Sequence, residues 1–150
     1  ELKKILLLKN LSSLFISEIS NVIILNIFPQ LKYYERLKSF NKLSNTTKTH
    51  YDVNLILALF LLDESNGYEY FCHKYKTSNK LKHRFENIVN NFKNFQKKNF
   101  LKEENIKKLI YFSNKNDVID LLLFSICVNN KIKNIPIEKL IDYIKFCKIG

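Results

Sequence analysis

The clearest hydrophobic pattern in this sequence lies between residues 78 and 95. Apolar side chains recur there at intervals of three and four, at Leu81, Phe85, Ile88, Val89, Phe92 and Phe95. This spacing places them on one face of an α-helix, whereas a β-strand needs alternation in steps of two. The hydroxyl of Ser78 can accept a hydrogen bond from a free backbone amide of the first turn. The pattern predicts a long amphipathic helix with Ser78 as its N-cap, and we expect the other helices to pack around it.

Similar spacings predict helices along the rest of the chain. Residues 51–63 are hydrophobic around most of the helix circumference, which is typical of a helix in the middle of a bundle. Residues 118–128 form a second, strongly apolar helix. Further helices are expected over residues 1–9, 11–19, 22–28, 31–43 and 68–75, from 103 to 112, and from 136 to 146. In the last two of these helices we expect Phe112 and Phe146 to face inward with the other apolar residues.

Polar residues and prolines divide these helices. Ser20 and Asn21 predict a turn, and Pro29 should stop the preceding helix because the residue before a proline is pushed out of the helical region. Residues 44–50 are small and polar, and they predict a loop. Asn66 and Gly67 predict another turn.

The composition supports an all-helical fold. The 150 residues include 12 Phe and 8 Tyr, enough for a real core, but only two Gly and two Pro, too few for the turns of a β-sandwich or barrel. We therefore predict an all-α bundle of about eight or nine helices. No repeat or linker divides the chain, so residues 1–150 are expected to form one domain.

The formal net charge of +11 suggests an acidic partner such as RNA, DNA or an anionic membrane. Only Arg36 and Arg84 are arginines, and the other cations are lysines in a chain rich in Asn and Ile. A coding genome biased toward A and T would produce the same composition without selection for binding. Both explanations of the charge stay open at this point.

The cations are densest between residues 74 and 84, where the sequence predicts a site for nucleic acid. The candidate RNA-binding residues are Lys74, Tyr75, Lys76, Lys80, Lys82 and Arg84. Lysines bind phosphates as point charges, and an aromatic ring can stack on a base. Cations at a helix N-terminus oppose the helix dipole, so a purely structural helix would gain from acids there. This favours a phosphate partner over a merely solvated helix face.

Residues for catalysis or metal binding are sparse. No Gly-rich phosphate loop and no pair of carboxylates spaced for two-metal chemistry is present. Cys72, His73 and His83 fit no zinc motif, and we expect the cysteine to pack in the core and the histidines to lie on polar faces. The three cysteines are widely spaced and imply no disulfide framework, which favours a reducing cytoplasm. No apolar run reaches the length of a membrane span.

Four short motifs resemble the helical region that follows the catalytic head in bacterial CCA-adding tRNA nucleotidyltransferases and their poly(A) polymerase relatives. Residues 1–6 are similar to the end of the helix that follows the head, and residues 24–29 to a turn that ends in proline. Residues 54–61 resemble an apolar helix of the family, with Asn54 where the family often has arginine. The most specific match is Tyr75–Lys80, which looks like the start of the next helix.

This resemblance implies a helical neck and body that holds the acceptor arm and elbow of tRNA. The nucleotidyltransferase head, its metal-binding Asp-x-Asp and the neck motif that selects CTP and ATP are missing, so no catalytic residue is carried over and no activity is expected of residues 1–150 alone. Mg²⁺ and CTP or ATP would belong to that head, and none is expected to bind here. Because the chain lacks methionine and starts at Glu1, we expect it to be part of a longer protein.

Two other functions are considered. A helical scaffold that binds another protein would show an exposed apolar patch or a stable dimer. A peripheral membrane protein is less well supported, because no helix combines a strongly apolar face with a lysine-rich one.

Overall fold

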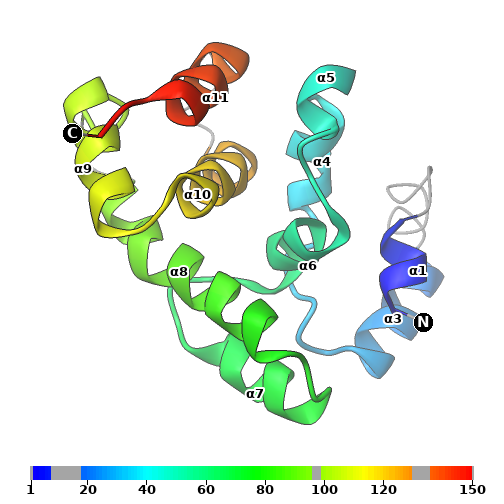
Figure 1. Cartoon of the computed structure of the whole chain (residues 1–150). Helices are drawn as coiled ribbons and strands as arrows, with labels where there is room; N and C mark the ends of the chain where they lie inside the picture. Colours follow the sequence, from blue (N-terminus) through cyan, green and yellow to red (C-terminus); the bar gives the residue numbers. More distant parts are fainter. Residues whose placement is uncertain (1, 8–17, 96–98, 130–135, 150) are drawn as a thin grey trace.

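The structure is a computed structural model that describes residues 2–7, 18–95, 99–129 and 136–149. Within these residues the chain forms ten α-helices and no β-strand, which confirms the all-α class and is close to the predicted number of helices (Figure 1). The helices are α1 (Leu2–Leu6), α3 (Glu18–Ile27), α4 (Arg36–Asn41), α5 (Asn45–Lys48), α6 (Val53–Leu61), α7 (Gly67–Lys74), α8 (Asn79–Phe95), α9 (Glu103–Phe112), α10 (Lys115–Val128) and α11 (Ile137–Phe146).

Helix α8 is the amphipathic helix that the sequence predicts. The backbone amide of Leu81 donates to the Ser78 hydroxyl at 3.2 Å, which confirms Ser78 as the N-cap. All six residues of the apolar stripe are buried, and the exposed residues of α8 are all polar. The period of the sequence was sufficient to fix this helix because α8 has only one face to bury.

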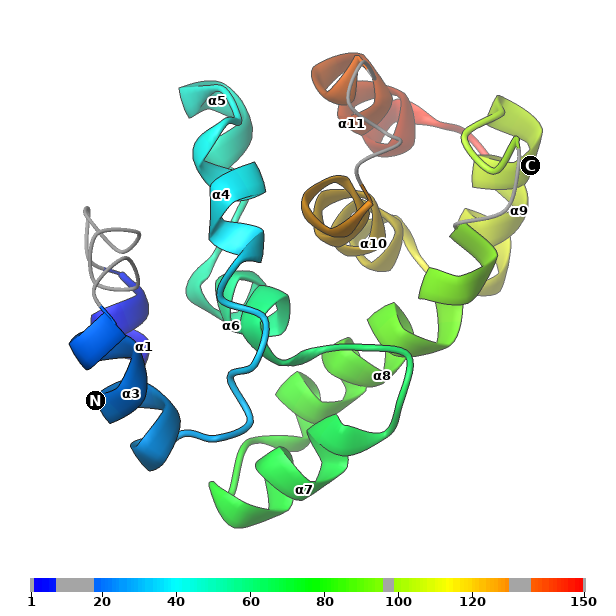
Figure 2. The same cartoon turned by 180° about the vertical axis from the view of Figure 1, so that it is seen from behind.

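Helix α10, rather than α8, is the helix around which the others pack. It contacts α4, α6, α8, α9 and α11, while the packing of α8 is chiefly against α10 and α7. Figures 1 and 2 show α10 beside α8, with α9 and α11 on one side and α4 and α6 on the other. The expectation that α8 is central is therefore wrong. Residues 121–125 of α10 are all buried, so this helix needs neighbours around most of its circumference, whereas α8 needs them on one side.

Helix α6 is buried as predicted and is closed at both ends by side chains. At its start, the Asp52 carboxylate accepts a hydrogen bond from the amide of Leu55 at 2.8 Å. At its end, Arg36 Nη1 donates to the carbonyls of Leu59 at 2.9 Å and Leu62 at 2.6 Å. These bonds satisfy carbonyls that have no partner within the helix, and they bind α4 to α6.

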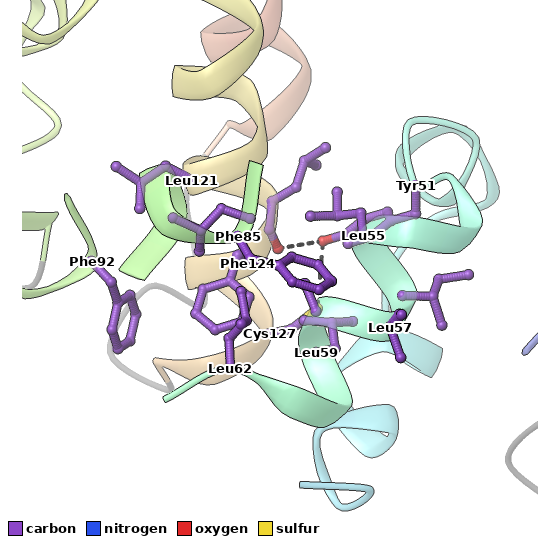
Figure 3. Packing of buried hydrophobic residues seen from close by; sticks show 14 of the residues in the cluster. Tyr51, Leu55, Leu57, Leu59, Leu62, Phe85, Phe92, Leu121, Phe124 and Cys127 are labelled. Carbon is purple, nitrogen blue, oxygen red and sulfur yellow. Dashed lines mark hydrogen bonds between the residues drawn. The ribbon is translucent and has the colours of Figure 1, made fainter. Parts of the chain in front are cut away.

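The middle of the core contains a hydrogen-bonded tyrosine among apolar side chains (Figure 3). The Tyr51 hydroxyl donates to the carbonyl of Leu123 at 2.6 Å and lies 3.4 Å from the Cys127 sulfur. Nearby, the rings of Phe92 and Phe124 meet edge to face at 5.2 Å between centroids. The polar tip of Tyr51 is therefore satisfied inside the core, and it joins the segment before α6 to α10.

Residues 18–43 differ from the prediction in two places. Ser20 and Asn21, predicted to form a turn, lie inside α3, which then ends before Pro29 as expected. Both residues have only a weak preference against helix, and continuing the helix keeps their backbone bonded. The helix predicted from Leu31 begins only at Arg36, because the amide of Tyr33 donates instead to the carbonyl of Phe60 at the end of α6, at 3.1 Å. The helix predicted over residues 11–19 lies largely outside the described residues.

The predicted loop over residues 44–50 contains the one-turn helix α5. Ser44 caps it by accepting from the amide of Thr47 at 3.2 Å. Thr47 is only 3% exposed, and its hydroxyl donates to Glu138 of α11 at 3.0 Å. The prediction failed because the partner that makes a buried Thr47 favourable is 91 positions away in the sequence.

Phe112 and Phe146 do not face inward as predicted. They are 82% and 78% exposed, although the other apolar residues of their helices, apart from Tyr111, are buried or half-buried. At about 100° per residue, Phe146 lies roughly opposite Ile137 on the helix circumference. A helical projection of the sequence would have found this, since Phe146 does not continue the stripe formed by Ile137, Ile141 and Ile144.

Candidate nucleic-acid interface

Four exposed lysines surround the turn between α7 and α8, and we call them the basic corner. They are Lys74, Lys76, Lys80 and Lys82. Lys74 is the last residue of α7, Lys76 lies in the turn, and the other two belong to the first turn of α8. Two helix ends and one turn therefore hold four cationic side chains within nine consecutive residues.

The turn has a defined backbone geometry. The amide of Thr77 donates to the carbonyl of Cys72 at 3.1 Å, and the amide of Lys76 donates to that of His73 at 3.4 Å. This bond pair closes the end of α7 in a Schellman motif. Lys76 occupies the left-handed position of the motif with φ of 50°, where glycine is usual. In this left-handed conformation a lysine makes the fold less stable than a glycine would. Local stability therefore does not explain the choice of lysine at position 76.

None of the four lysines pairs with a carboxylate in the described part of the chain. Lys74 instead lies with its ammonium 5.4 Å from the centre of the Tyr75 ring. The basic corner therefore carries four positive charges that no ion pair offsets. Such a surface attracts phosphates, and the attraction weakens as salt is added.

Tyr75, which the sequence places in the candidate site, has its ring against the core. Its centroid is 4.7 Å from that of Phe71 and 5.6 Å from that of Phe28, and its hydroxyl donates to the carbonyl of Ile27 at 3.4 Å. The half-buried ring thereby joins the end of α7 to the end of α3. These contacts of Tyr75 fix the position of its neighbours Lys74 and Lys76 in the basic corner.

Arg84 also belongs to the predicted site, and it takes part in a cluster of ion pairs. Its Nε and Nη2 donate to the Asp120 carboxylate at 2.6 and 2.9 Å, and its Nη1 donates to Asp52 at 2.6 Å. The hydrogen bonds that Arg84 donates to Asp120, and secondly to Asp52, hold the pKa of Arg84 well above its ordinary value, although burial lowers it. Its charge is neutralised within the fold, so Arg84 is separate from the four unpaired lysines.

A pocket of about 960 Å³ opens between α8 and the start of α10, next to the basic corner. Lys80, Arg84 and Asn87 form one wall, while Asp117 and Asp120 belong to the opposite wall. The pocket thus has nearly balanced charges, and no Phe, Tyr or Trp is among its lining residues. Only Lys80 is shared between the pocket and the basic corner.

One carboxylate in the pocket is held in an unfavourable environment. Asp117 accepts hydrogen bonds from the side-chain amides of Asn87 at 3.1 Å and Asn114 at 2.7 Å. Burial and the negative charge of Asp120 nevertheless raise its pKa. The bond between Asn87 and Asp117 holds α8 against α10. The two carboxylates, Asp117 and Asp120, make this part of the pocket unfavourable for an anion.

The remaining candidate residues for metal binding or catalysis do not form a site in the described part of the chain. Cys72 is buried, while His73 and His83 are exposed, as the sequence predicts. Among the described residues, no three His, Cys, Asp or Glu side chains gather so as to hold a metal ion. A search of these same residues finds no helix with the length and hydrophobicity needed to cross a membrane.

Comparisons of the chain with protein families, curated proteins and solved structures find no match. The resemblance to tRNA nucleotidyltransferases therefore stays a prediction from four short motifs. In the structure, the most specific of these motifs, Tyr75–Lys80, is the turn and helix start that carry half of the basic corner.

Proposed function

We propose that this chain is an RNA-binding helical body of the kind that holds tRNA for a nucleotidyltransferase adding CCA or poly(A) to RNA 3′ ends. The observation that carries the proposal is the set of four exposed, unpaired lysines at the α7–α8 turn. The motif resemblance is a second argument, and it shares Lys76 and Lys80 with the first. The catalytic head, its Mg²⁺ and its nucleotide would lie outside residues 1–150.

The arrangement suits recognition of RNA by shape and phosphate position. The four lysines are attached to two helix ends and a Schellman turn, so backbone hydrogen bonds fix the points from which their side chains extend before the RNA arrives. Point charges at fixed spacing contact phosphates without reading bases. Double-stranded RNA is commonly recognised in this way, because side chains cannot read its narrow major groove.

The test compares tRNA binding by the chain and by the variant with Lys74, Lys76, Lys80 and Lys82 all changed to Gln. We expect the variant to bind tRNA much more weakly, and each lost phosphate contact to lower the salt dependence of log K by about one. The matched control removes the same charge elsewhere, by changing the exposed residues Lys32, Lys38, Lys42 and Lys139 to Gln. It should lose much less affinity, since its loss is limited to long-range attraction.

Two results would overturn the proposal. One is equal loss of tRNA affinity in both fourfold variants, which would make the attraction a matter of net charge alone. The other is binding to tRNA that is no stronger than binding to duplex DNA of equal charge at physiological salt. Circular dichroism of both variants checks that the helical fold is intact.

We place the protein in the cytoplasm, where tRNA is processed. In support, the three cysteines Cys72, Cys127 and Cys147 are all free and buried in the fold, which agrees with a reducing compartment.

A second candidate function is supported by α3. Val22, Ile23 and Ile27 are each more than half exposed and lie within two turns of one helix. Such a patch favours a helical scaffold that binds another protein. Light scattering during an RNA titration separates the two: a stable dimer or no change on adding RNA supports the scaffold, and a complex with one tRNA supports the RNA-binding body.

A further inference from the structure

Three aromatic rings are exposed at one end of the α9–α10–α11 group, outside the basic corner. Tyr111 and Phe112 end α9 and Phe146 ends α11, with side chains 71%, 82% and 78% exposed. Tyr111 and Phe112 stand nearly perpendicular, with 5.3 Å between their centroids. A group of large exposed apolar side chains can mark a surface that binds a partner.

A hydrogen bond brings these two helix ends together. Lys115, the first residue of α10, donates through Nζ to the carbonyl of Lys145 at 2.7 Å. Lys145 is the neighbour of Phe146, and Lys115 follows Phe112 by three residues, a stretch of at most about 10 Å. The ends of α9 and α11 that carry the rings are therefore both close to the start of α10.

Lysines flank the rings, although the exposed Asp142 lies one helical turn before Phe146. Residues 105–116 and 143–149 contain no Asp or Glu, and their cations are Lys107, Lys108, Lys115, Lys145 and Lys148. On α9, Lys107 and Lys108 precede Tyr111 and Phe112 by one helical turn, on the same sides of the helix. Each of these two rings thus has a lysine about 6 Å away along the helix axis.

We propose that this aromatic–lysine surface binds unpaired nucleotides of RNA, with bases stacked on Tyr111, Phe112 and Phe146 and phosphates near the flanking lysines. The inference rests on the proposed RNA-binding function and adds a second contact to it. The basic corner would take phosphates of a folded region, and this surface would take a single-stranded one. Stacking on aromatic rings beside cations is how proteins bind single strands without reading their sequence.

The arrangement of side chains favours a single strand over a lipid surface. A helix that inserts into lipid needs a continuous apolar stripe along its length. On α9 the positions one turn before the rings are lysines, and one turn before Phe146 is the exposed Asp142. On α9, isolated rings that alternate with lysines match the alternation of bases and phosphates instead.

The test uses an RNA hairpin with a blunt end and the same hairpin with a short 3′ oligoadenosine overhang that contains 2-aminopurine. We expect the full chain to bind the overhang hairpin more tightly and to change the 2-aminopurine fluorescence. Changing both Phe112 and Phe146 to Ser should reduce overhang binding about tenfold, since each stacked base contributes appreciably. Binding of the blunt hairpin should stay the same.

The control variant changes Val22 and Ile27 to Ser, which removes two exposed apolar side chains from α3, and it should bind both hairpins normally. Asp142→Asn should strengthen overhang binding, because it removes the carboxylate beside Phe146. Equal binding of both hairpins by the unmodified chain overturns this inference and leaves the proposed function standing. Failure to bind either hairpin overturns both. Loss of sedimentation with phosphatidylserine vesicles in the Phe112 and Phe146 variant, with overhang binding unchanged, would assign the surface to lipid and overturn the inference.

Discussion

Arg84 on α8 and Asp120 on α10 form a two-pronged ion pair, with Nε and Nη2 donating to the two carboxylate oxygens at 2.6 and 2.9 Å. The side chain of Asp120 is only 13% exposed, so its charge relies on the arginine for compensation. The pair joins the two helices that pack most extensively against each other. An arginine that the sequence suggested for binding RNA is thus a structural link between helices.

Arg84→Ala should destabilise the fold by roughly 3 kcal/mol, because it leaves a mostly buried carboxylate without a partner. Urea denaturation followed by circular dichroism measures the free energy of unfolding. The double change of Arg84 to Met and Asp120 to Leu should cost less than Arg84→Ala alone, since it removes both charges. A loss below about 1 kcal/mol in the single variant would mean that the pair behaves as a surface contact.

Asp52 should contribute to stability in a way that depends on pH. Burial raises its pKa, but the hydrogen bonds from Arg84 and from the amide of Leu55 outweigh this and lower the pKa of Asp52 from its ordinary 3.8. A lowered pKa in the folded state adds stability above 3.8, and this stability is lost as the pH falls through the folded pKa. Asp52→Asn, which keeps a capping side chain, should therefore be less stable than the parent protein at pH 7, by at most about 1 kcal/mol.

The difference between the parent protein and Asp52→Asn should vanish in acid, which urea titrations at several pH values can follow. Asp52→Ala also loses the cap and should cost about 1 kcal/mol more at every pH. A gap between the parent and Asp52→Asn that persists at the lowest pH would show that the ion pair is not its source.

Lys76→Gly should separate stability from binding. The left-handed φ of 50° favours glycine over lysine, so the variant should unfold at a higher temperature, with a gain of about 0.5–1 kcal/mol. The same change should weaken tRNA binding, because one cation of the basic corner is lost. Thermal unfolding and a binding titration on one sample measure both effects.

Asn99→Gly is the matched control, since Asn99 has φ of 68° and lies outside the basic corner. Asparagine tolerates this region, so Asn99→Gly should change stability little and tRNA affinity not at all. Unchanged tRNA affinity in Lys76→Gly would remove Lys76 from the interface.

Cys127 should be unreactive in the native protein. Burial raises the pKa of its thiol to about 11, although the Tyr51 hydroxyl and Arg36 act in the opposite direction. The reactive thiolate is therefore rare at pH 8, and the core also blocks reagents. A thiol-specific reagent should label Cys127 only in urea, in step with unfolding. Fast labelling without urea would mean that α10 opens locally.

The sequence predicted helices best where one segment contains all the necessary information. Ser78 and the stripe of α8 are an example, because the cap and the helix face are both set within 18 residues. The N-cap of α10 is equally local, since the side chain of Asn114 accepts a hydrogen bond from the amide of Asp117, three positions on. Three predictions failed: the turn at Ser20, the loop at Thr47 and the helix start before Arg36. At these places packing or distant hydrogen-bond partners outweighed weak local preferences.

The same distinction between local and distant information applies to the candidate site. The exposed lysines of the basic corner could be found from the sequence, because Lys80 and Lys82 lie beside the apolar stripe of α8 and the other two lie at the end of α7 and in the turn. The bonding of Tyr75 and Arg84 could not, since Phe28, Asp52 and Asp120 lie 32 to 47 positions away. The exposed rings of Phe112 and Phe146 fall between these cases, because a helical projection would have placed at least Phe146 on the outer face.

By itself, the sequence determined an all-helical fold, the caps and buried face of its main amphipathic helix, and the position of its densest cations. Only the tertiary structure decided that α10 is the central helix, that Arg84 is held by two carboxylates and that the ends of α9 and α11 both lie near the start of α10. The reason is physical. Periodicity and capping act over a few residues, whereas the pairing of charges and the covering of helix faces depend on which distant segments meet when the chain folds.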